Sequence, residues 1–128
     1  MRKTWLILSF LIIGVMIGGC GSGNSTAQDQ AALDSLREAG SEMTMLHPFD
    51  FYIYHHDKAG AKQICTLLLQ DGFEVIVREG AGGDDWLCFA SLSFVPSFEK
   101  LSELQEKFEN LTSQYGGEYD GWETIVIP

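Results

Sequence analysis

Positive charge is scarce in this chain of 128 residues, which has eight Lys and Arg against 18 Asp and Glu. Arg2 and Lys3 stand at its start, so the part after residue 19 keeps six cations and a net charge of −12. Such a surface repels phosphate groups, which argues against direct binding of nucleic acid or of anionic lipid head groups. A basic protein partner is compatible with it, although the charge could also serve only solubility.

Motifs of the common cofactor sites are also lacking. There is no Walker loop, dinucleotide fingerprint or zinc-knuckle spacing, and no lysine follows the glycines at 80–83. One group of candidate metal ligands is close in sequence: His47, Asp50, His55, His56 and Asp57. Adjacent side chains of a strand point to opposite sides, so this spacing favours solvated residues leading into a helix over a metal site. We therefore predict no cofactor, no metal and no catalysis.

Cysteine occurs three times, and Cys20 has the most informative surroundings. It follows two N-terminal cations, the apolar run Trp5 to Ile17 and the pair Gly18-Gly19. This order is typical of a bacterial lipoprotein signal peptide. We expect residues 1–19 to be removed and Cys20 to carry the acyl chains, palmitate among them, that anchor the chain. The apolar run is shorter than the roughly 20 residues of a spanning helix, which disfavours an uncleaved signal anchor.

Acylation at Cys20 predicts a location as well. The domain would lie on the extracytoplasmic side of a membrane. Gly21 stands where some lipoproteins carry an aspartate that retains them at the inner membrane, so a host with two membranes would place this chain at the outer one. Export would also permit a disulfide between Cys65 and Cys88. Their apolar surroundings favour two buried thiols instead, and the sequence leaves both alternatives open.

The rest of the chain divides into two parts. Residues 20–46 are rich in Gly, Ser, Asn and Gln, with a weakly helical patch at Gln28–Glu38 in which Leu33 and Leu36 are the only large apolar residues. We predict a flexible tether there. Residues 47–128 are enough for one small domain with a single core.

Strand and helix signals alternate within 47–128. Phe49–Tyr54 is aromatic and indicates a strand. Ala61, Ile64, Cys65 and Leu68 share one face of a helix that ends at Asp71-Gly72. Phe73–Arg78 alternates as a second strand, with Phe73, Val75 and Val77 on one side and Glu74, Ile76 and Arg78 on the other.

The second half repeats this order. Trp86–Ser93 is apolar on both faces and indicates a central strand. A helix starts after Pro96-Ser97, shows an apolar stripe from Phe98 to Tyr115, and ends at Gly116-Gly117. Glu118–Ile127 supplies the last strand. The order and the right-handed crossover rule predict a ferredoxin-like α+β sandwich, βαββαβ, with two helices on a four-stranded antiparallel sheet.

Several short segments resemble the regulator of ribonuclease E activity B (RraB) family. They are Asp71–Val75 (DGFEV), Trp86–Ala90 (WLCFA), Val95-Pro96 and, most specific, Tyr115–Glu123 (YGGEYDGWE). The resemblance covers residues 47–124. It implies a ferredoxin-like fold, no catalysis, and inhibition of an endoribonuclease by direct protein contact. Because that enzyme works in the cytoplasm, an acylated Cys20 predicts a different partner, such as an envelope or secreted protein.

Candidate contact residues lie in and near the YGGEYDGWE segment. Aromatic residues beside glycines in a strand more often pack than bind, whereas the acidic residues there suit a basic partner. We predict a partner-binding surface formed by Asp84, Asp85, Glu118, Tyr119, Asp120, Trp122 and Glu123. The favoured function is a membrane-anchored, non-catalytic regulatory module. An envelope accessory or toxin-neutralising lipoprotein is the alternative, and a metal-dependent enzyme is the weakest.

Overall fold

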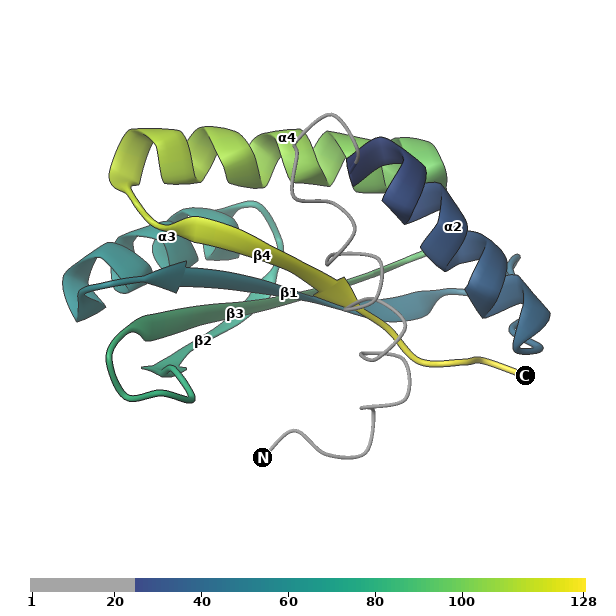
Figure 1. Ribbon diagram of the computed structural model, residues 1–128, viewed down its shortest axis with the longest axis horizontal. Coiled ribbons are helices and arrows are strands. Elements are labelled where there is room, and N and C mark those ends of the chain that lie inside the picture. The colour runs from purple at the N-terminus through teal and green to yellow at the C-terminus, as the bar shows by residue number, and fades with distance from the viewer. Residues whose placement is uncertain (1–24) are drawn as a thin grey trace. The chain divides into compact units, whose positions relative to one another are not determined.

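A computed structural model describes residues 25–128, which form three helices and four strands (Figure 1). The helices are α2 (Ser25–Glu38), α3 (Lys58–Gln70) and α4 (Phe98–Tyr115), and the strands are β1 (His47–His55), β2 (Glu74–Glu79), β3 (Trp86–Phe94) and β4 (Glu118–Glu123). The strand order β2-β3-β1-β4 gives one antiparallel sheet with β3 in an inner position. The predicted ferredoxin-like α+β sandwich is confirmed.

The predicted signal peptide at 1–19 and Cys20 lie outside the described residues. Within residues 25–128, no helix combines the length and the apolar character needed to cross a membrane.

Over residues 25–38, helix α2 contradicts the flexible tether expected at 20–46. Its apolar residues Ala32, Leu33 and Leu36 are buried. Its Asp29 accepts a hydrogen bond of 2.9 Å from the indole Nε1 of Trp122. The sequence pattern was weak because only two large apolar residues mark the helix, and the contact that holds Asp29 lies 93 positions away. The folded domain therefore begins well before residue 47.

The described chain forms two compact units. We call residues 25–49, 93–104 and 122–128 the first unit, and residues 50–92 and 105–121 the second unit. Strands β1, β3 and β4 and helix α4 each contribute residues to both.

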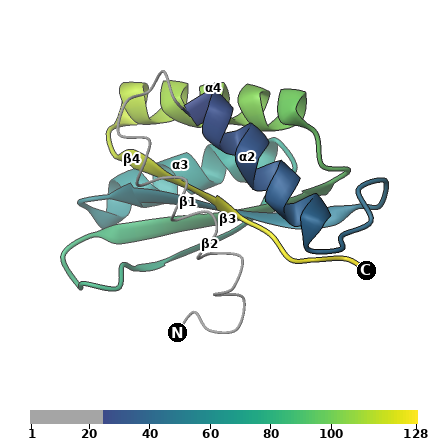
Figure 2. The ribbon, with the colours of Figure 1, turned by 45° about the vertical axis from the view of Figure 1, so that its right-hand side comes forward.

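The second unit has an aromatic core beneath two helices. The Phe108 ring of α4 lies 4.9 Å from the Phe51 ring and 5.9 Å from the Phe73 ring, centroid to centroid. The predicted apolar face of α3 is buried, and it consists of Ala61, Ile64, Cys65 and Leu68. Figures 1 and 2 show α3 and the C-terminal part of α4 on one face of the sheet. Burial of these side chains supplies the main stabilising term of the unit.

Both helices begin at a side-chain cap. Asp57 accepts a hydrogen bond of 2.8 Å from the Gly60 N–H at the start of α3. Ser97 accepts one of 2.9 Å from the Lys100 N–H at the start of α4. Each cap satisfies a backbone donor that has no partner within its helix.

The first unit relies more on polar contacts between distant segments. Its apolar centre is Phe49, which stacks on Phe94 at 4.2 Å and lies 5.4 Å from Trp122. Strand β4 ends at Glu123 and not at Ile127 as predicted. The chain beyond it is still held, because Thr124 donates to the Pro48 carbonyl at 2.7 Å.

Candidate functional site

One face of the sheet in the second unit packs against α3 and α4. Phe51 of β1 and Tyr119 of β4 both contact Phe108, so both point toward the helices. Side chains alternate along a strand, so their neighbours point to the opposite face. On β2 and β3, Val77 pairs with Cys88, which is bonded to α3, and this again places the flanking residues on the opposite face. We call that surface the open face: Asp50, Tyr52, Glu74, Ile76, Arg78, Phe89, Ser91, Glu118 and Asp120.

The centre of the open face is apolar and aromatic. The Phe89 ring lies edge-on to Tyr52 at 5.3 Å, and the Arg78 guanidinium lies over it at 4.9 Å. Ile76 is paired with Phe89 in the β2–β3 register and is 53% exposed. Aromatic residues and arginine are enriched at the centre of protein contact surfaces, so the cluster of Tyr52, Phe89 and Arg78 beside Ile76 is a candidate for one.

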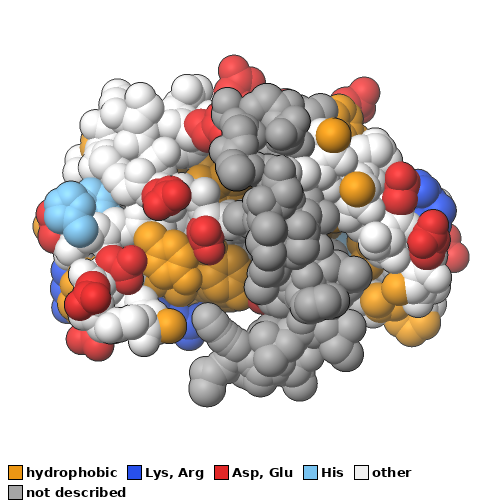
Figure 3. Space-filling view, viewed as in Figure 1, with side chains coloured by type: hydrophobic (Ala, Val, Ile, Leu, Met, Phe, Trp, Pro, Cys, Tyr) orange, Lys and Arg blue, Asp and Glu red, His pale blue; other side chains and the backbone are white. Residues whose placement is uncertain are grey.

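Carboxylates surround this centre. Asp50 accepts a hydrogen bond of 2.7 Å from the Ser91 hydroxyl, while Glu74, Glu118 and Asp120 are exposed. Partial burial of the Asp120 carboxyl raises its pKa above the usual value, and repulsion from Glu118 raises that pKa further. Figure 3 shows an apolar area bordered by several carboxylates. The open face therefore favours a ligand that brings positive charge.

The structure brings only some of the predicted contact residues to a surface. Glu118 and Asp120 lie on the open face. Trp122 and Glu123 are each only 6% exposed, and Tyr119 is half-buried against Phe108. The interpretation of Trp122 and Glu123 as surface contacts is wrong, because both side chains are buried, and the Trp122 indole packs near Phe49 and donates to Asp29. Gly121 has a φ of 121°, a conformation that favours glycine.

Asp84 and Asp85 lie in the turn between β2 and β3. Asp84 is exposed, and Asp85 is half-buried. The Asp85 backbone carbonyl accepts a hydrogen bond of 2.8 Å from the Gly80 N–H, which closes the turn. A side chain at position 80 would collide with the Asp85 carboxylate. Asp85 is thus part of the turn's packing, whereas Asp84 remains available to solvent.

The glycine pair in the YGGEYDGWE segment has a structural role around His55. The buried His55 ring donates from Nε2 to the Tyr115 carbonyl at 2.9 Å. A Cβ atom on Gly116 would lie 3.0 Å from that ring, and one on Gly117 would lie 2.5 Å from the Tyr54 carbonyl oxygen. Both glycines also have positive φ, at 90° and 103°. The glycines of the most specific segment of the resemblance are therefore required by a tight helix-to-strand turn that packs on His55.

The hydrogen bonds of His55 also make the group of candidate metal ligands around it a poor metal site. His55, His56 and Asp57 do offer ligand atoms within 4.8 Å of one another. The Nδ1 of His55, however, accepts the Asp57 N–H at 3.0 Å, and its Nε2 donates to the Tyr115 carbonyl. Both ring nitrogens are used, so no lone pair remains for a metal. The two exposed groups left over, His56 and Asp57, are too few for a structural site.

A second histidine, His47, is hydrogen-bonded to Ser41 in the first unit. His47 Nε2 lies 2.5 Å from the Ser41 hydroxyl, and its Nδ1 lies 2.8 Å from the Met45 carbonyl. The Ser41 oxygen also accepts the Ile127 N–H at 2.9 Å. His47 is fully buried and Ser41 nearly so, which leaves no access for a substrate. The pair therefore serves to hold the C-terminal segment.

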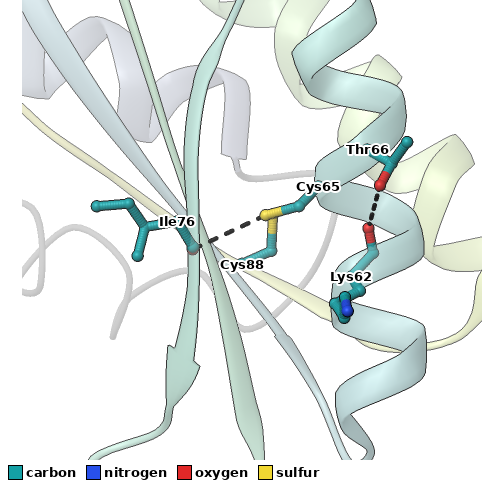
Figure 4. Close-up of a disulfide and its surroundings, with 5 residues drawn as sticks. All are labelled: Lys62, Cys65, Thr66, Ile76 and Cys88. Carbon is teal, nitrogen blue, oxygen red and sulfur yellow. Dashed lines mark hydrogen bonds between the residues drawn. A yellow bond between two sulfur atoms is a disulfide. The ribbon is translucent and has the colours of Figure 1, made fainter.

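Cys65 and Cys88 form a disulfide that joins α3 to β3 (Figure 4). The interpretation of these residues as buried free thiols is wrong, and the alternative is the correct one. Their Cα atoms are 5.6 Å apart, well within the range that a disulfide can bridge. The Cys65 sulfur also lies 3.8 Å from the Ile76 carbonyl oxygen, directly behind the open face.

The sequence patterns did not identify the apolar centre of the open face as a candidate site. Alternation along Phe73–Arg78 did predict that Ile76 and Arg78 share a face. Placing Phe89 and Tyr52 beside them required the register between β2 and β3 and the strand order, which no local pattern reveals.

The fold and the open face together define a small α+β module that presents one face of its sheet. Residues 26–124 match the profile of a family described as regulator of ribonuclease activity B, RraB. A Haemophilus influenzae protein named regulator of ribonuclease activity B is 29% identical over 102 residues, covering 77% of this chain and 67% of that protein. A protein of the same name from Actinobacillus succinogenes is 26% identical over 102 residues, covering 77% and 72%. The chain belongs to the RraB family.

The family match includes α2, which the resemblance to residues 47–124 had left out. Helix α2 is thus part of the family domain, in agreement with its burial in the first unit.

Proposed function

We propose that this protein is a lipid-anchored regulator that acts outside the cytoplasm by binding another protein, without catalysis. The regulatory class comes from the family, whose relatives carry the name of ribonuclease regulators. The location comes from the lipoprotein-type sequence that ends at Cys20. For this chain we infer that the regulated protein is an envelope or secreted protein in place of a cytoplasmic ribonuclease.

The Cys65–Cys88 disulfide is the observation that carries this proposal. Disulfides persist in secreted and envelope proteins, whereas the cytosol keeps thiols reduced. Both cysteines are buried, so the bond links core elements and is unlike an exposed redox pair. A disulfide in the core and an acylation sequence at the N-terminus support the same compartment independently.

Charge supports a protein partner. The net charge of −12 after residue 19 disfavours nucleic acid and anionic lipid as ligands. Electrostatic complementarity would speed association with a basic partner and would discriminate against acidic ones.

Helix α2 sets the reach of the anchored domain. Only residues 21–24 separate Cys20 from Ser25, where the helix begins. At about 3.4 Å per residue, five steps span at most about 17 Å. An anchored domain would therefore meet its partner close to the membrane surface, where a tether of 27 residues would have allowed a far wider search.

Metabolic labelling with a clickable fatty acid tests the anchor. In a bacterial host that acylates lipoproteins, the wild-type chain should incorporate label and fractionate with membranes. Cys20→Ala should take up no label, while the matched control Ser22→Ala should label as the wild type does. A wild-type chain that is unlabelled and cytosolic would contradict the proposal.

A further inference from the structure

We propose that the open face docks a basic segment of the partner protein, with an apolar side chain against Ile76 and Phe89 and cations beside Glu118 and Asp120. This deepens the regulatory function proposed above and rests on it, because it names the surface and the chemistry of the binding step.

The apolar centre provides the contact energy. Ile76 exposes about half of its surface on the outer strand β2, and the Phe89 ring beside it is only half-buried. Covering such side chains is favourable by roughly 25 cal/mol per Å² of apolar area. The centre is also rigid, because Phe89 is held between Tyr52 and Arg78 and Ile76 lies in a paired strand backed by the disulfide. Little ordering entropy is then lost on docking.

The carboxylates around the apolar centre, which we call the rim, favour a positively charged segment. Glu118 and Asp120 are two positions apart on β4, and within residues 25–128 neither forms an ion pair. Their mutual repulsion is relieved when a cation lies between them, so a basic group gains energy there that a neutral group does not. Arg78 is the cation among the residues of the open face, and its guanidinium group lies over the Phe89 ring in a cation–π contact.

The same features disfavour other occupants. A phosphate or an anionic head group would meet four carboxylates: Asp50, Glu74, Glu118 and Asp120. A second copy of this chain would bring the same acidic rim against itself, since a symmetric dimer uses one patch twice. A segment in which Lys or Arg flanks an apolar residue matches both the centre and the rim.

Site-specific photocrosslinking in the full chain, in cells that naturally carry it, tests the proposal. A crosslinking residue at Ile76 should give a protein adduct whose crosslinked peptide has an excess of Lys and Arg. The matched control is Leu69, which is 58% exposed on α3 and lies away from the open face. It should give at least about tenfold less of that adduct.

Charge reversal separates the rim from general acidity. Glu118→Lys with Asp120→Lys should lower the Ile76 adduct at least about tenfold, because both cations would repel a basic segment. Glu106→Lys with Glu109→Lys makes the same change in net charge on the exposed side of α4 and should leave most of the adduct. Circular dichroism and an intact Cys65–Cys88 bond confirm that each variant is folded.

Several outcomes would overturn the docking proposal: no adduct at Ile76, equal adducts at Ile76 and Leu69, an acidic peptide, or a second copy of the chain. The anchor is tested separately. If Cys20 is acylated while Ile76 gives no adduct, only the docking surface fails. If Ile76 captures a basic peptide in a chain that is not acylated, the surface stands and the proposed location fails.

Discussion

The first unit and the second unit are each stabilised internally, and the kind of contact differs between them. The second unit has an aromatic cluster around Phe108 and a disulfide between Cys65 and Cys88. The first unit depends on buried polar bonds between distant segments, namely Asp29 to Trp122 and Ser41 to His47. Apolar burial is non-directional and scales with the area removed from water, whereas a buried polar bond needs one particular partner and is costly once that partner is lost.

This difference suggests a division of roles. The second unit carries the open face and is the more strongly cross-linked, so it suits a rigid contact surface. In the first unit, α2 is the first described helix after Cys20 in the sequence, and it is held by the Asp29–Trp122 hydrogen bond and by its buried apolar side chains. We expect loss of that pair to loosen α2 and to leave the open face intact.

The largest expected effect is in the aromatic cluster. Phe108→Ala should lower the free energy of unfolding by about 3–5 kcal/mol, because it leaves a cavity among Phe51, Phe73 and Tyr119. Denaturant unfolding measures the change. Leu69→Ala, at an exposed position of α3, is the control and should stay within about 0.5 kcal/mol. Similar losses in the two variants would argue against this cluster as the main source of stability.

Removal of the disulfide should come next. The bond closes a loop with a sequence separation of 23 residues. Cys65→Ala with Cys88→Ala should lower the free energy of unfolding by about 2–4 kcal/mol. Reduction of the wild type should shift the unfolding midpoint in the same direction and should not affect the double variant. A double variant as stable as the oxidised wild type would show that the bond adds nothing.

In the first unit, Trp122→Phe should lower stability by about 1–3 kcal/mol, because it leaves the Asp29 carboxylate buried without its donor. Hydrogen exchange should locate the loss, with faster exchange in α2 and little change in α3. Adding Asp29→Ala to Trp122→Phe should recover part of the protection, since both polar partners are then gone. Equal loss of protection in α3 would contradict separate fastening of the two helices.

The smallest expected effect is a pH dependence that comes from Asp29. Burial raises the pKa of this carboxyl above its ordinary 3.8, and the Trp122 bond opposes that rise without cancelling it. The folded chain thus holds the proton more tightly than the unfolded chain does. The contribution to stability is complete below pH 3.8 and is lost as the pH rises through the raised pKa.

Asp29→Asn keeps an oxygen acceptor for Trp122 but does not titrate there. As the pH rises from 3.8 through the raised pKa of Asp29, the free energy of unfolding of the wild type should therefore fall relative to that of Asp29→Asn. Parallel pH profiles for the two proteins would mean that Asp29 does not titrate with a raised pKa.

Sequence patterns predicted the second unit better than the first for a physical reason. The apolar face of α3 and the alternation of β2 are local signals, with periods that the residues themselves display. Helix α2 has few apolar residues, and its polar contact depends on Trp122, which is far away in the chain. The burial of Trp122 depends on Asp29 and Phe49, which lie far away in the chain, and the open face follows from strand order. Neither has a local signature.

Mass spectrometry of the chain purified from membranes, alkylated without reduction, tests the central claim of an anchored domain outside the cytoplasm. The account predicts an N-terminal peptide that begins at an acylated Cys20, together with a linked peptide pair that contains Cys65 and Cys88. A chain that still begins at Met1, with both of these cysteines alkylated as free thiols, would contradict it.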